Sequence, residues 1–337
     1  MATCGGYNCS MDRAFVTGVS GQDGSLLADL LLAEGLEVYG LVRRKADATN
    51  WRIRHLECEQ LFHLVHGDML DTSSLTRALA DIRPQYVFNL AAQSFIPYSW
   101  DAPLATASVT ALGALNLLEA VRAAGSAARY YQASSSEMFG KVLETPQRET
   151  TPLYPRSPYG VSKCFAHWIT VNYRESFGLF ACSGILFNHE SECRGMEFVT
   201  RKLTYAVARI KRGQQHAVRL GNLDAARDWG YAPEYVEAMW RMLSAAEPQD
   251  YVIATGRNHT VRQLCEAAFG AAGLKWEEHV ELDQALLRPA EVNTLLGDAS
   301  KARQQLGWEP RVSFEEMIER MVAADLHRVD NSITWET

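Results

Sequence analysis

The sequence predicts an α/β protein built on a doubly wound parallel sheet, with a smaller α/β lobe interwoven at its C-terminal end. Two observations lead to this prediction. Short apolar runs alternate with helix-periodic segments from residue 13 to about residue 135, and such alternation is typical of parallel sheets. The first strand is followed by a glycine-rich turn that opens a helix, and this arrangement is typical of a Rossmann-type phosphate-binding fold.

The N-terminal units can be read in chain order. Residues 14–17 form a short apolar strand, and Leu26, Leu27, Leu30 and Leu31 give residues 25–34 a helical period that stops at Gly35. Four further strands are expected, and a long helix precedes the last of them. The strands cover residues 37–42, 61–65, 86–90 and 129–133, and the helix covers about 102–124.

The second half of the chain is less regular. A helix over 159–177 and a buried strand over 181–187 are followed by a helix within 195–213 and a polar stretch, 220–230, that we expect to be a loop. The remaining expected elements are a helix over 233–245, a strand over 251–255, and helices over 261–272 and 314–326. We place the larger domain at residues 12–188, with returns from about 214–260, and the lobe mainly at 189–330.

Composition excludes several classes of protein. A net charge of −7 argues against a nucleic-acid partner, which needs a basic face. No apolar run approaches the roughly 20 residues that span a bilayer, and no signal peptide is visible. Seven scattered cysteines suit reduced thiols in a cytoplasm, and Cys4 and Cys9 lack a second ligand pair, so no metal site is expected.

Residues 17–24 read Thr-Gly-Val-Ser-Gly-Gln-Asp-Gly and predict a dinucleotide site. Its glycines, Gly18, Gly21 and Gly24, allow close approach of a pyrophosphate to the helix N-terminus, where Gln22 and Asp23 also lie. The second strand ends in Arg43 rather than in the carboxylate that an NAD site places there, with Arg52 shortly after.

Because a guanidinium matches a 2′-phosphate, these arginines predict NADP as the cofactor. A solvated basic loop is the alternative, and it applies more to Arg44 and Lys45 than to Arg43. Asp68, after the third strand, is either an adenine contact or a plain turn residue.

Tyr159 and Lys163 stand four residues apart, so they share one face of a helix. An ammonium there can lower the pKa of the phenol, which is ordinarily near ~10, and hold a nicotinamide ribose. Upstream lies Ser134-Ser135-Ser136-Glu137, at the end of the fifth strand. We assign Ser135 a hydrogen bond to a substrate oxygen, Tyr159 the role of base, and Lys163 that of electrostatic partner.

Glu137 adds a chemistry that a simple dehydrogenase does not need. Oxidation at C4 of a sugar acidifies the hydrogen on C5, so a carboxylate can remove it as water leaves C6 and the hydride returns there. A surface glutamate and ordinary turn serines are the alternatives.

These residues resemble the extended short-chain dehydrogenase/reductase family and, within it, the GDP-mannose 4,6-dehydratases. The resemblance covers about residues 12–325 and includes LFNHES (186–191), FVTRK (198–202), LGNLDAARDWGY (220–231) and RPAEV (288–292). It implies conversion of GDP-D-mannose to GDP-4-keto-6-deoxy-D-mannose with tightly held NADP, in a homodimer or homotetramer.

In such enzymes the loop after strand two reaches a neighbouring subunit's cofactor, which would give Arg43 and Arg52 a second role. Further residues are expected at the two ligand sites. They are Met69, Leu90, Ala91, Ala92 and His189 at the cofactor, and Ser94, Asn188, Arg194, Lys202, Arg227, Arg288 and Glu291 at the nucleotide sugar.

Three departures from the pattern of the family are visible. Ser135 replaces the usual Thr, Phe95 stands where many relatives have His, and Glu192-Cys193 replaces Pro-Arg. The last change removes an arginine and adds a carboxylate near the expected diphosphate. An NADP-dependent GDP-sugar reductase or epimerase, a dehydratase acting on a modified GDP-hexose, and a non-catalytic NADP-binding protein therefore stay as alternatives.

Overall fold

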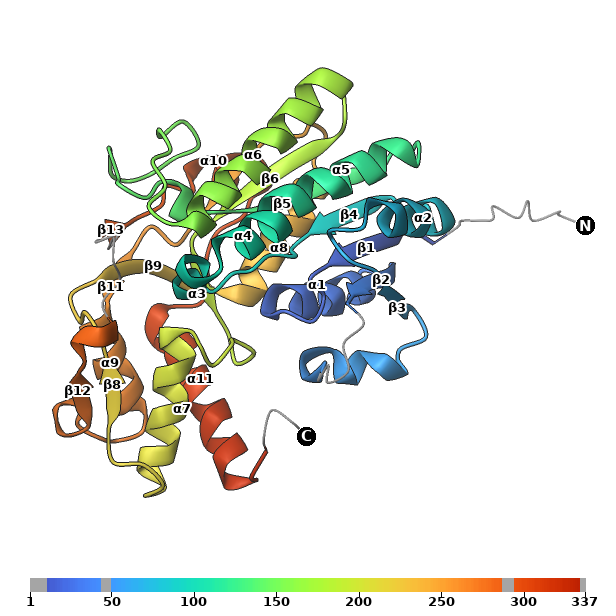
Figure 1. Cartoon of the computed structure of the whole chain (residues 1–337). Helices are drawn as coiled ribbons and strands as arrows, with labels where there is room; N and C mark the ends of the chain where they lie inside the picture. Colours follow the sequence, from blue (N-terminus) through green and yellow to red (C-terminus); the bar gives the residue numbers. More distant parts are fainter. Residues whose placement is uncertain (1–10, 44–49, 287–293, 334–337) are drawn as a thin grey trace, which may run out of the picture.

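The computed structural model describes residues 11–43, 50–286 and 294–333. Its centre is a seven-stranded sheet of order β10-β6-β5-β4-β1-β2-β3 (Figure 1). Every neighbouring pair runs parallel, as the sequence predicts. The strands are β1 Arg13–Thr17, β2 Glu37–Val42, β3 Phe62–His66, β4 Tyr86–Asn89, β5 Arg129–Ser135, β6 Ala181–Leu186 and β10 Tyr251–Ile253. The strand order reverses between β1 and β4, and ligands of doubly wound sheets bind beyond the carboxyl ends at such a point.

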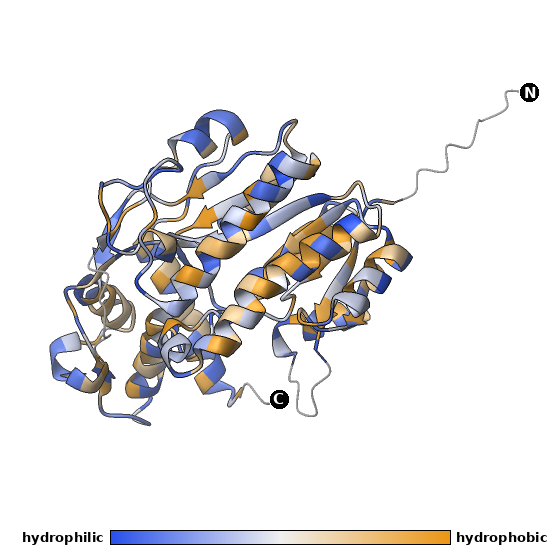
Figure 2. Cartoon of the chain, turned by 45° about the horizontal axis from the view of Figure 1, so that its top comes forward, coloured by the Kyte–Doolittle hydropathy of each residue, from blue (hydrophilic) through white to orange (hydrophobic). Residues whose placement is uncertain are grey.

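Helices cover both faces of this sheet, so its strands are buried on two sides. One face carries α1 (Gln22–Ala33) and α8 (Ala232–Ser244), whose apolar side chains form one core with the strands. The other carries α2 (Thr72–Ile82), α5 (Gly113–Ala123) and α6 (Pro158–Phe177). Figure 2 shows apolar and polar residues alternating along the helices that flank the sheet, as amphipathic helices require.

Local capping chemistry sets where several helices begin and end. The Asp71 side chain accepts hydrogen bonds from the N–H groups of Ser73 and Ser74 at the start of α2. At the start of α6, the Ser157 hydroxyl accepts from Gly160 N, and the helix ends at Gly178 with φ +65°. Such caps satisfy main-chain groups that a helix leaves unpaired at its ends.

The long helix expected over 102–124 is segmented. It consists of α4 (Pro103–Ala107), a π turn η2 (Ser108–Leu112) and α5, and α3 (Ile96–Asp101) precedes it. Together Pro103–Ala123 is 21 residues long with a mean hydropathy of 1.5, enough by length and composition to cross a membrane. The expectation that no apolar run reaches this length was therefore wrong. Half of this stretch is buried inside the fold, as in the core helix of a globular domain.

A second core lies beside the sheet, at the lower left of Figure 1. It is formed by α7 (Val199–Lys211), α9 (Val261–Ala271) and α11 (Phe314–Asp330), together with the two-stranded sheet of β8 (Val218–Leu220) and β12 (Val280–Leu282). The remaining helical elements are short. They are η1 Trp51–Cys58, η3 Ser136–Met138, η4 Trp276–Glu278, η5 Gln284–Leu286 and α10 Ser300–Leu306.

The prediction of a loop over residues 220–230 was wrong. This stretch contains most of β9 (Ala226–Tyr231), which pairs with β7 (Asn188–Glu190), β11 (Asn258–Thr260) and β13 (Thr294–Leu295). The segment looks polar partly because of Asp228, which is in fact buried within the strand. Its carboxylate accepts hydrogen bonds from Thr255 and from the Gly256 and Gly297 N–H groups. Its partners lie far along the chain, so local hydropathy does not reveal the strand.

Candidate active site

The glycine-rich turn between β1 and α1 packs tightly against the end of β4. A Cβ on Gly18, which has φ +70°, would lie 2.8 Å from Ala91 N, and one on Gly24 would lie 2.2 Å from Gly18 O. Neither position accepts a side chain without moving main chain. The N-cap of α1, Gly21, provides no side-chain hydrogen bond, so the N-terminal N–H groups of this helix face the cavity uncapped. Such a turn fits the pyrophosphate of a dinucleotide.

A cavity of about 810 Å³ opens at the carboxyl edge of the sheet and extends to the second core. All but one of the predicted site residues that the structure describes line it. They are Gly18, Gly21, Gln22, Asp23, Gly24, Arg43, Asp68, Met69, Leu90, Ala91, Ala92, Ser94, Ser135, Glu137, Tyr159, Lys163, Asn188, His189, Arg194, Lys202 and Arg227. Arg44, Lys45, Arg288, Glu291 and the two N-terminal cysteines, Cys4 and Cys9, lie outside the described residues.

Arg52 is the predicted residue that the structure does not bring to the cavity. Its Nε donates to Cys193 O at 2.7 Å and its Nη1 to Ser20 O at 3.3 Å, while the guanidinium stacks on Trp51. Burial is the largest influence on the pKa of Arg52 and lowers that pKa. Arg52 therefore joins the glycine-rich turn to the segment around residue 193 through main-chain carbonyls.

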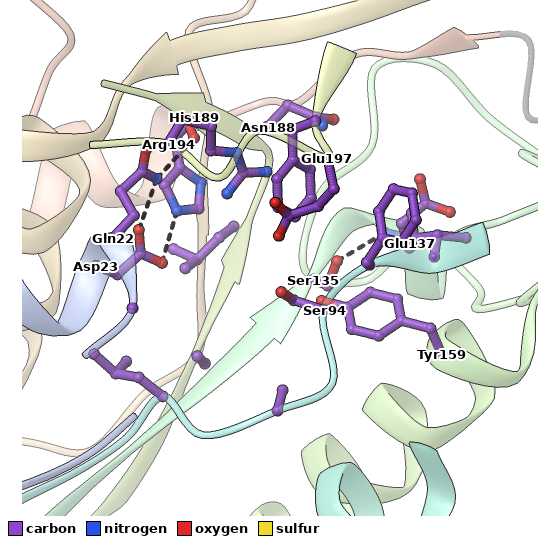
Figure 3. A pocket seen from close by; sticks show the side chains of 18 of the residues that line it. Gln22, Asp23, Ser94, Ser135, Glu137, Tyr159, Asn188, His189, Arg194 and Glu197 are labelled. Carbon is purple, nitrogen blue, oxygen red and sulfur yellow. Dashed lines mark hydrogen bonds and ion pairs between the residues drawn. The ribbon is translucent and has the colours of Figure 1, made fainter. Parts of the chain in front are cut away.

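Four side chains from three elements line the cavity together. Figure 3 shows three of them, Ser135, Glu137 and Tyr159, on one side of it. Ser135 ends β5, Glu137 lies in η3, and Tyr159 and Lys163 project from the first turns of α6. Their exposed fractions are 9, 7, 8 and 4%. Water is thus largely excluded from all four, which strengthens electrostatic interactions among them.

The packing of α6 fixes this group of side chains. The Lys163 Nζ donates to Ala133 O at 2.7 Å and lies 5.7 Å from the centre of the Tyr159 ring. A Cβ on Gly160 would lie 2.8 Å from Glu137 O, so the residue after the tyrosine must be small for α6 to approach η3. The Ser135 Oγ accepts a hydrogen bond from Glu137 N at 3.3 Å.

The chain alone does not make Tyr159 a base near neutral pH. Burial raises the pKa of Tyr159 to about 12, although the Ser135 hydroxyl acts in the opposite direction, and the nearby Glu137 charge raises it further. Desolvation dominates, and the positive charge that lowers the pKa of Tyr159 in the chain alone is that of Arg194. A further positive charge is needed before the phenolate becomes accessible.

Burial also lowers the pKa of Lys163 to about 8, against the opposing charge of Asp23. This folded-state value lies below the roughly 10.4 of an unfolded chain, so the buried ammonium costs stability below about pH 8. As pH rises from about 8 towards 10.4, that cost disappears. The residue is thus retained at a cost to stability, which is common at functional sites.

On the opposite side of the cavity, the half-buried Asp23 and the buried His189 form a pair with 2.9 Å between Oδ2 and Nε2 (Figure 3). The Nδ1 of His189 faces Phe187 O at 2.7 Å, so both ring nitrogens point at oxygen acceptors, as in an imidazolium. Burial favours the neutral ring, but Asp23 outweighs it and raises the pKa of His189. For Asp23, burial is the largest single effect and acts to raise its pKa. The charge of His189 and the hydrogen bonds to the carboxylate together outweigh burial, so that the pKa of Asp23 is lowered.

Gln22 extends this pair into a link between α1 and β7. Its Nε2 donates to Asp23 Oδ1 and to His189 O, and its Oε1 accepts from the Ser191 hydroxyl at 2.9 Å. The glycine-rich turn is therefore attached to the segment that carries Asn188 and Arg194.

Arg194 lies on the same side as His189. Its Nε pairs with Glu190 at 3.0 Å, and its guanidinium carbon lies 3.5 Å from the centre of the Phe198 ring. The charge of Arg194 acts on both Asp23 and His189. The structure therefore places Arg194 near Asp23 and His189, on the side of the cavity next to the glycine-rich turn.

The Glu192-Cys193 departure does not put a carboxylate into the cavity. Neither side chain lines it, and the Glu192 carboxylate accepts a hydrogen bond from the Tyr231 hydroxyl at 3.3 Å. Residues 192 and 193 form a turn, and the residues on either side of it, Glu190 and Arg194, do line the cavity. Phe95 does line the cavity, where its ring packs edge-on against Phe198.

Sequence reasoning missed part of the lining. Glu197, Phe198 and Thr200 come from the segment in which only Lys202 was predicted. Asn222, Val261 and Leu286 complete the end near the second core. Phe198 and Thr200 belong to the FVTRK stretch itself, so this stretch was the available signal, and Glu197 directly precedes it. The second group depends on β8 and α9 packing, which has no local signal.

Comparisons with known proteins agree with this geometry. A family profile described as GDP-mannose 4,6 dehydratase matches residues 15–321. GDP-mannose 4,6 dehydratase 1 of Arabidopsis thaliana is 54% identical over 323 residues, covering 93% of this chain and 89% of that protein.

Two solved structures resemble the whole chain. RMD from Pseudomonas aeruginosa complexed with NADPH is 26% identical with a TM-score of 0.78, covering 94% of this chain and all of that one. UDP-glucose 4-epimerase of Thermus thermophilus in complex with NAD is 29% identical with a TM-score of 0.80, covering 93 and 98%.

Proposed function

The chain belongs to the GDP-mannose 4,6-dehydratase family, and we propose that its cavity converts GDP-D-mannose to GDP-4-keto-6-deoxy-D-mannose with the release of water. One observation supports this most directly: a carboxylate, Glu137, is only 7% exposed and lines the same cavity as Ser135, Tyr159 and Lys163. A simple dehydrogenation at C4 uses the last three residues only. The carboxylate supplies the additional proton transfer that elimination requires.

The proposed roles balance as follows. Tyr159 takes the proton of the C4 hydroxyl, and Ser135 donates a hydrogen bond to that oxygen. Glu137 takes the C5 proton and gives a proton to the C6 hydroxyl, which leaves as water. Tyr159 then returns its proton to C5. Lys163 favours the phenolate by its charge.

A nicotinamide cofactor fits the glycine-rich turn, because Gly18 and Gly24 leave no space for a Cβ and the α1 N-terminus is uncapped. When bound, it would accept the C4 hydride and return it to C6, and the positive charge of its oxidised ring would favour the phenolate of Tyr159. The N–H groups at the start of α1, at Gln22 and Asp23, would hold its pyrophosphate side together with Arg194, and the Asp23–His189 pair would lie beside it. Asp68, Met69 and the stretch from Leu90 to Ala92 would line its nucleoside side, all as cavity residues.

We propose NADP rather than NAD because Arg43 lines the cavity with an exposed guanidinium and because the residues described at the end of β2, up to residue 43, include no carboxylate. RMD was solved with NADPH and the epimerase with NAD, so the scaffold accepts both.

The nucleotide-sugar diphosphate is assigned to Asn188, Lys202 and Arg227. Arg227 is 6% exposed and lies on β9, and Lys202 Nζ donates to Arg219 O at 2.7 Å. Two cations and an amide suit a desolvated diphosphate. Ser94, beside Tyr159 in Figure 3, is assigned to the hexose. Arg288 and Glu291 remain predictions of the sequence.

Incubation of the purified protein with GDP-mannose tests the proposal. The expected product is lighter than GDP-mannose by about 18 Da, because one water is lost. The absorbance of NADPH should show no net change. Stoichiometric NADPH consumption would identify a reductase, and an unchanged mass with altered stereochemistry an epimerase. Retention of NADP without conversion of any GDP-hexose would indicate the non-catalytic alternative.

Replacing Arg43 by Ala is expected to weaken NADPH binding by about 10- to 100-fold, because one charge-assisted contact with the 2′-phosphate is lost. Binding of NADH should change by less than twofold. Isothermal titration with both cofactors measures the difference. The matched control is Arg77→Ala, since Arg77 is an exposed arginine on α2. Equal weakening of both cofactors would contradict the assignment.

A homo-oligomer is proposed from an apolar surface on α6 and the neighbouring α4–η2 segment. Val161, Phe165 and Trp168 recur on one face of α6 with exposed fractions of 56, 40 and 58%. Leu104 and Leu112, exposed by 83 and 49%, lie on the adjacent helical stretch. An apolar surface of this kind on a soluble protein marks an interface, and a second copy of the chain would cover it.

The Trp168→Glu variant is therefore expected to sediment as a smaller species than the wild type, because a carboxylate cannot be buried unpaired between two copies. Leu143→Glu, at a position 61% exposed in a loop, is the control and should sediment like the wild type. Sedimentation velocity distinguishes dimer, tetramer and monomer. Dissociation by both substitutions, or by neither, would contradict the assignment of this interface.

We also propose the division into a cofactor domain, residues 12–188 with returns from about 214–260, and a mainly nucleotide-sugar-binding lobe, residues 189–330. A cytoplasmic location is proposed from the scattered cysteines.

A further inference from the structure

A buried ionic cluster lies behind the cavity, between α7 and α11. Arg201 and Asp325 are both 0% exposed. The Arg201 Nε donates to both carboxylate oxygens at 3.0 and 2.8 Å, and Nη2 pairs with Oδ1 at 2.7 Å. The Thr204 hydroxyl and Arg328 Nη1 add contacts to the same carboxylate at 2.8 and 3.1 Å.

The other side of the cluster contacts the segment that bears Arg194. Arg201 Nη1 donates to Glu192 O at 2.7 Å and to Arg194 O at 3.1 Å. Arg328, from α11, donates to Glu192 O at 2.8 Å. Two guanidiniums therefore hold the carbonyls on either side of residue 193, and Arg52 holds the carbonyl of residue 193 itself.

Stability alone does not explain this arrangement. Removing two charges from water carries a large desolvation cost, so a buried ion pair is seldom more stabilising than well-packed apolar residues. What the pair does provide is a fixed geometry, since a bidentate guanidinium with two further carbonyl contacts has no alternative orientation. The contacts are to main chain, so they are compatible with the replaced side chains at positions 192 and 193.

Arg194 is the residue that this geometry controls. Its carbonyl is held by Arg201, its N–H donates to Ser191 O at 3.0 Å, and its guanidinium is held by Glu190 and Phe198. Glu190 is in turn held by the Thr200 hydroxyl at 2.6 Å, one residue before Arg201. Two residues at the start of α7 therefore position Arg194. Arg201 binds its main-chain carbonyl, and Thr200 binds the glutamate that pairs with its guanidinium.

We propose that Arg201, Asp325 and Arg328 are positioning residues that preorganise Arg194 for the cofactor pyrophosphate, which makes the C-terminal helix α11 part of the cofactor site. A flexible arginine loses rotamer freedom when it binds, and a preorganised one has already lost it. The inference rests on the proposed assignment of Arg194 to the cofactor.

Asp325→Asn tests the inference, because Asn keeps the shape of the side chain and removes its charge. The expected result is a rise of about 10-fold in the Kd for NADPH, with less than twofold change in the Kd for GDP, both measured by titration below the onset of unfolding. Asp250→Asn is the matched control. Asp250 also pairs bidentately with an arginine, Arg174, and accepts from Ser183 N, but it lies outside the cavity lining.

A double-mutant cycle shows whether the effect passes through Arg194. Arg194→Ala is expected to weaken NADPH by at least as much as Asp325→Asn, and the double variant should be no weaker than Arg194→Ala. Additive losses would overturn the inference, as would equal weakening by Asp250→Asn. If Arg194→Ala binds NADPH normally, the cofactor assignment of Arg194 fails instead.

Arg328→Met provides the same test if the Asn variant does not fold, because the Arg328 side chain is 14% exposed and does not touch Arg194 in any contact described above. A rise in the NADPH Kd that is smaller than the rise expected for Asp325→Asn, and that is absent in the Arg194→Ala background, supports the inference. An unchanged Kd overturns it.

Discussion

Replacing Glu137 by Gln is expected to lower kcat for GDP-mannose by about 10²- to 10⁴-fold, the range typical of a lost general acid–base group. Gln fills the same space but cannot take the C5 proton. Because the side chain is only 7% exposed, solvent cannot readily act in its place. The binding of NADPH and of GDP should be unchanged, since no phosphate contact is assigned to this residue.

The most specific measurement is hydrogen exchange at C5. In D₂O the wild-type product should carry deuterium at C5, and Glu137→Gln should lose this exchange together with water elimination. Glu175→Gln, at an exposed position on α6, is the control and should behave like the wild type. Full activity of the Glu137 variant would remove the proposed mechanism and leave only an oxidoreductase.

Replacing Tyr159 by Phe is expected to reduce kcat/KM by a similar factor of about 10²–10⁴. The reactive form is the phenolate, so wild-type kcat/KM should rise with pH up to the pKa of Tyr159 in the enzyme that holds its cofactor. In the chain alone burial raises that pKa to about 12. An activity that rises at much lower pH would therefore report the positive charges gained with the cofactor.

The Phe variant should retain the fold and lose this rise, because the substitution removes only the hydroxyl. Tyr173→Phe, also on α6 but hydrogen-bonded to Glu119 away from the cavity, provides the comparison. A Phe variant with the wild-type pH profile would show that another group is the base.

Much of the central sheet was predictable because each strand is a short apolar run beside a helix with a clear period. The glycine-rich turn was equally visible, since Gly18 and Gly24 reflect constraints within a few residues of chain. Tyr159 and Lys163 were found because helical spacing alone puts them on one face.

The errors have a common physical origin in distant partners. The stretch that contains β9 was predicted to be a loop because its polar residues have distant partners. The hydrogen-bond donors to Asp228, for example, belong to residues 255–256 and 297. The Glu192 carboxylate was expected near the diphosphate, but Tyr231, 39 residues away, accounts for its orientation. Arg201 and Asp325 are 124 residues apart, and neither residue type signals the other.

One cavity is lined both by the glycine-rich turn and by the residues that we propose for the nucleotide sugar. A hexose seated there would obstruct departure of the dinucleotide beneath it. Since the proposed cycle restores the oxidation state of that dinucleotide, the protein has no need to exchange it between turnovers. Freshly purified protein should then work without supplementation, and dialysis alone should inactivate it only slowly.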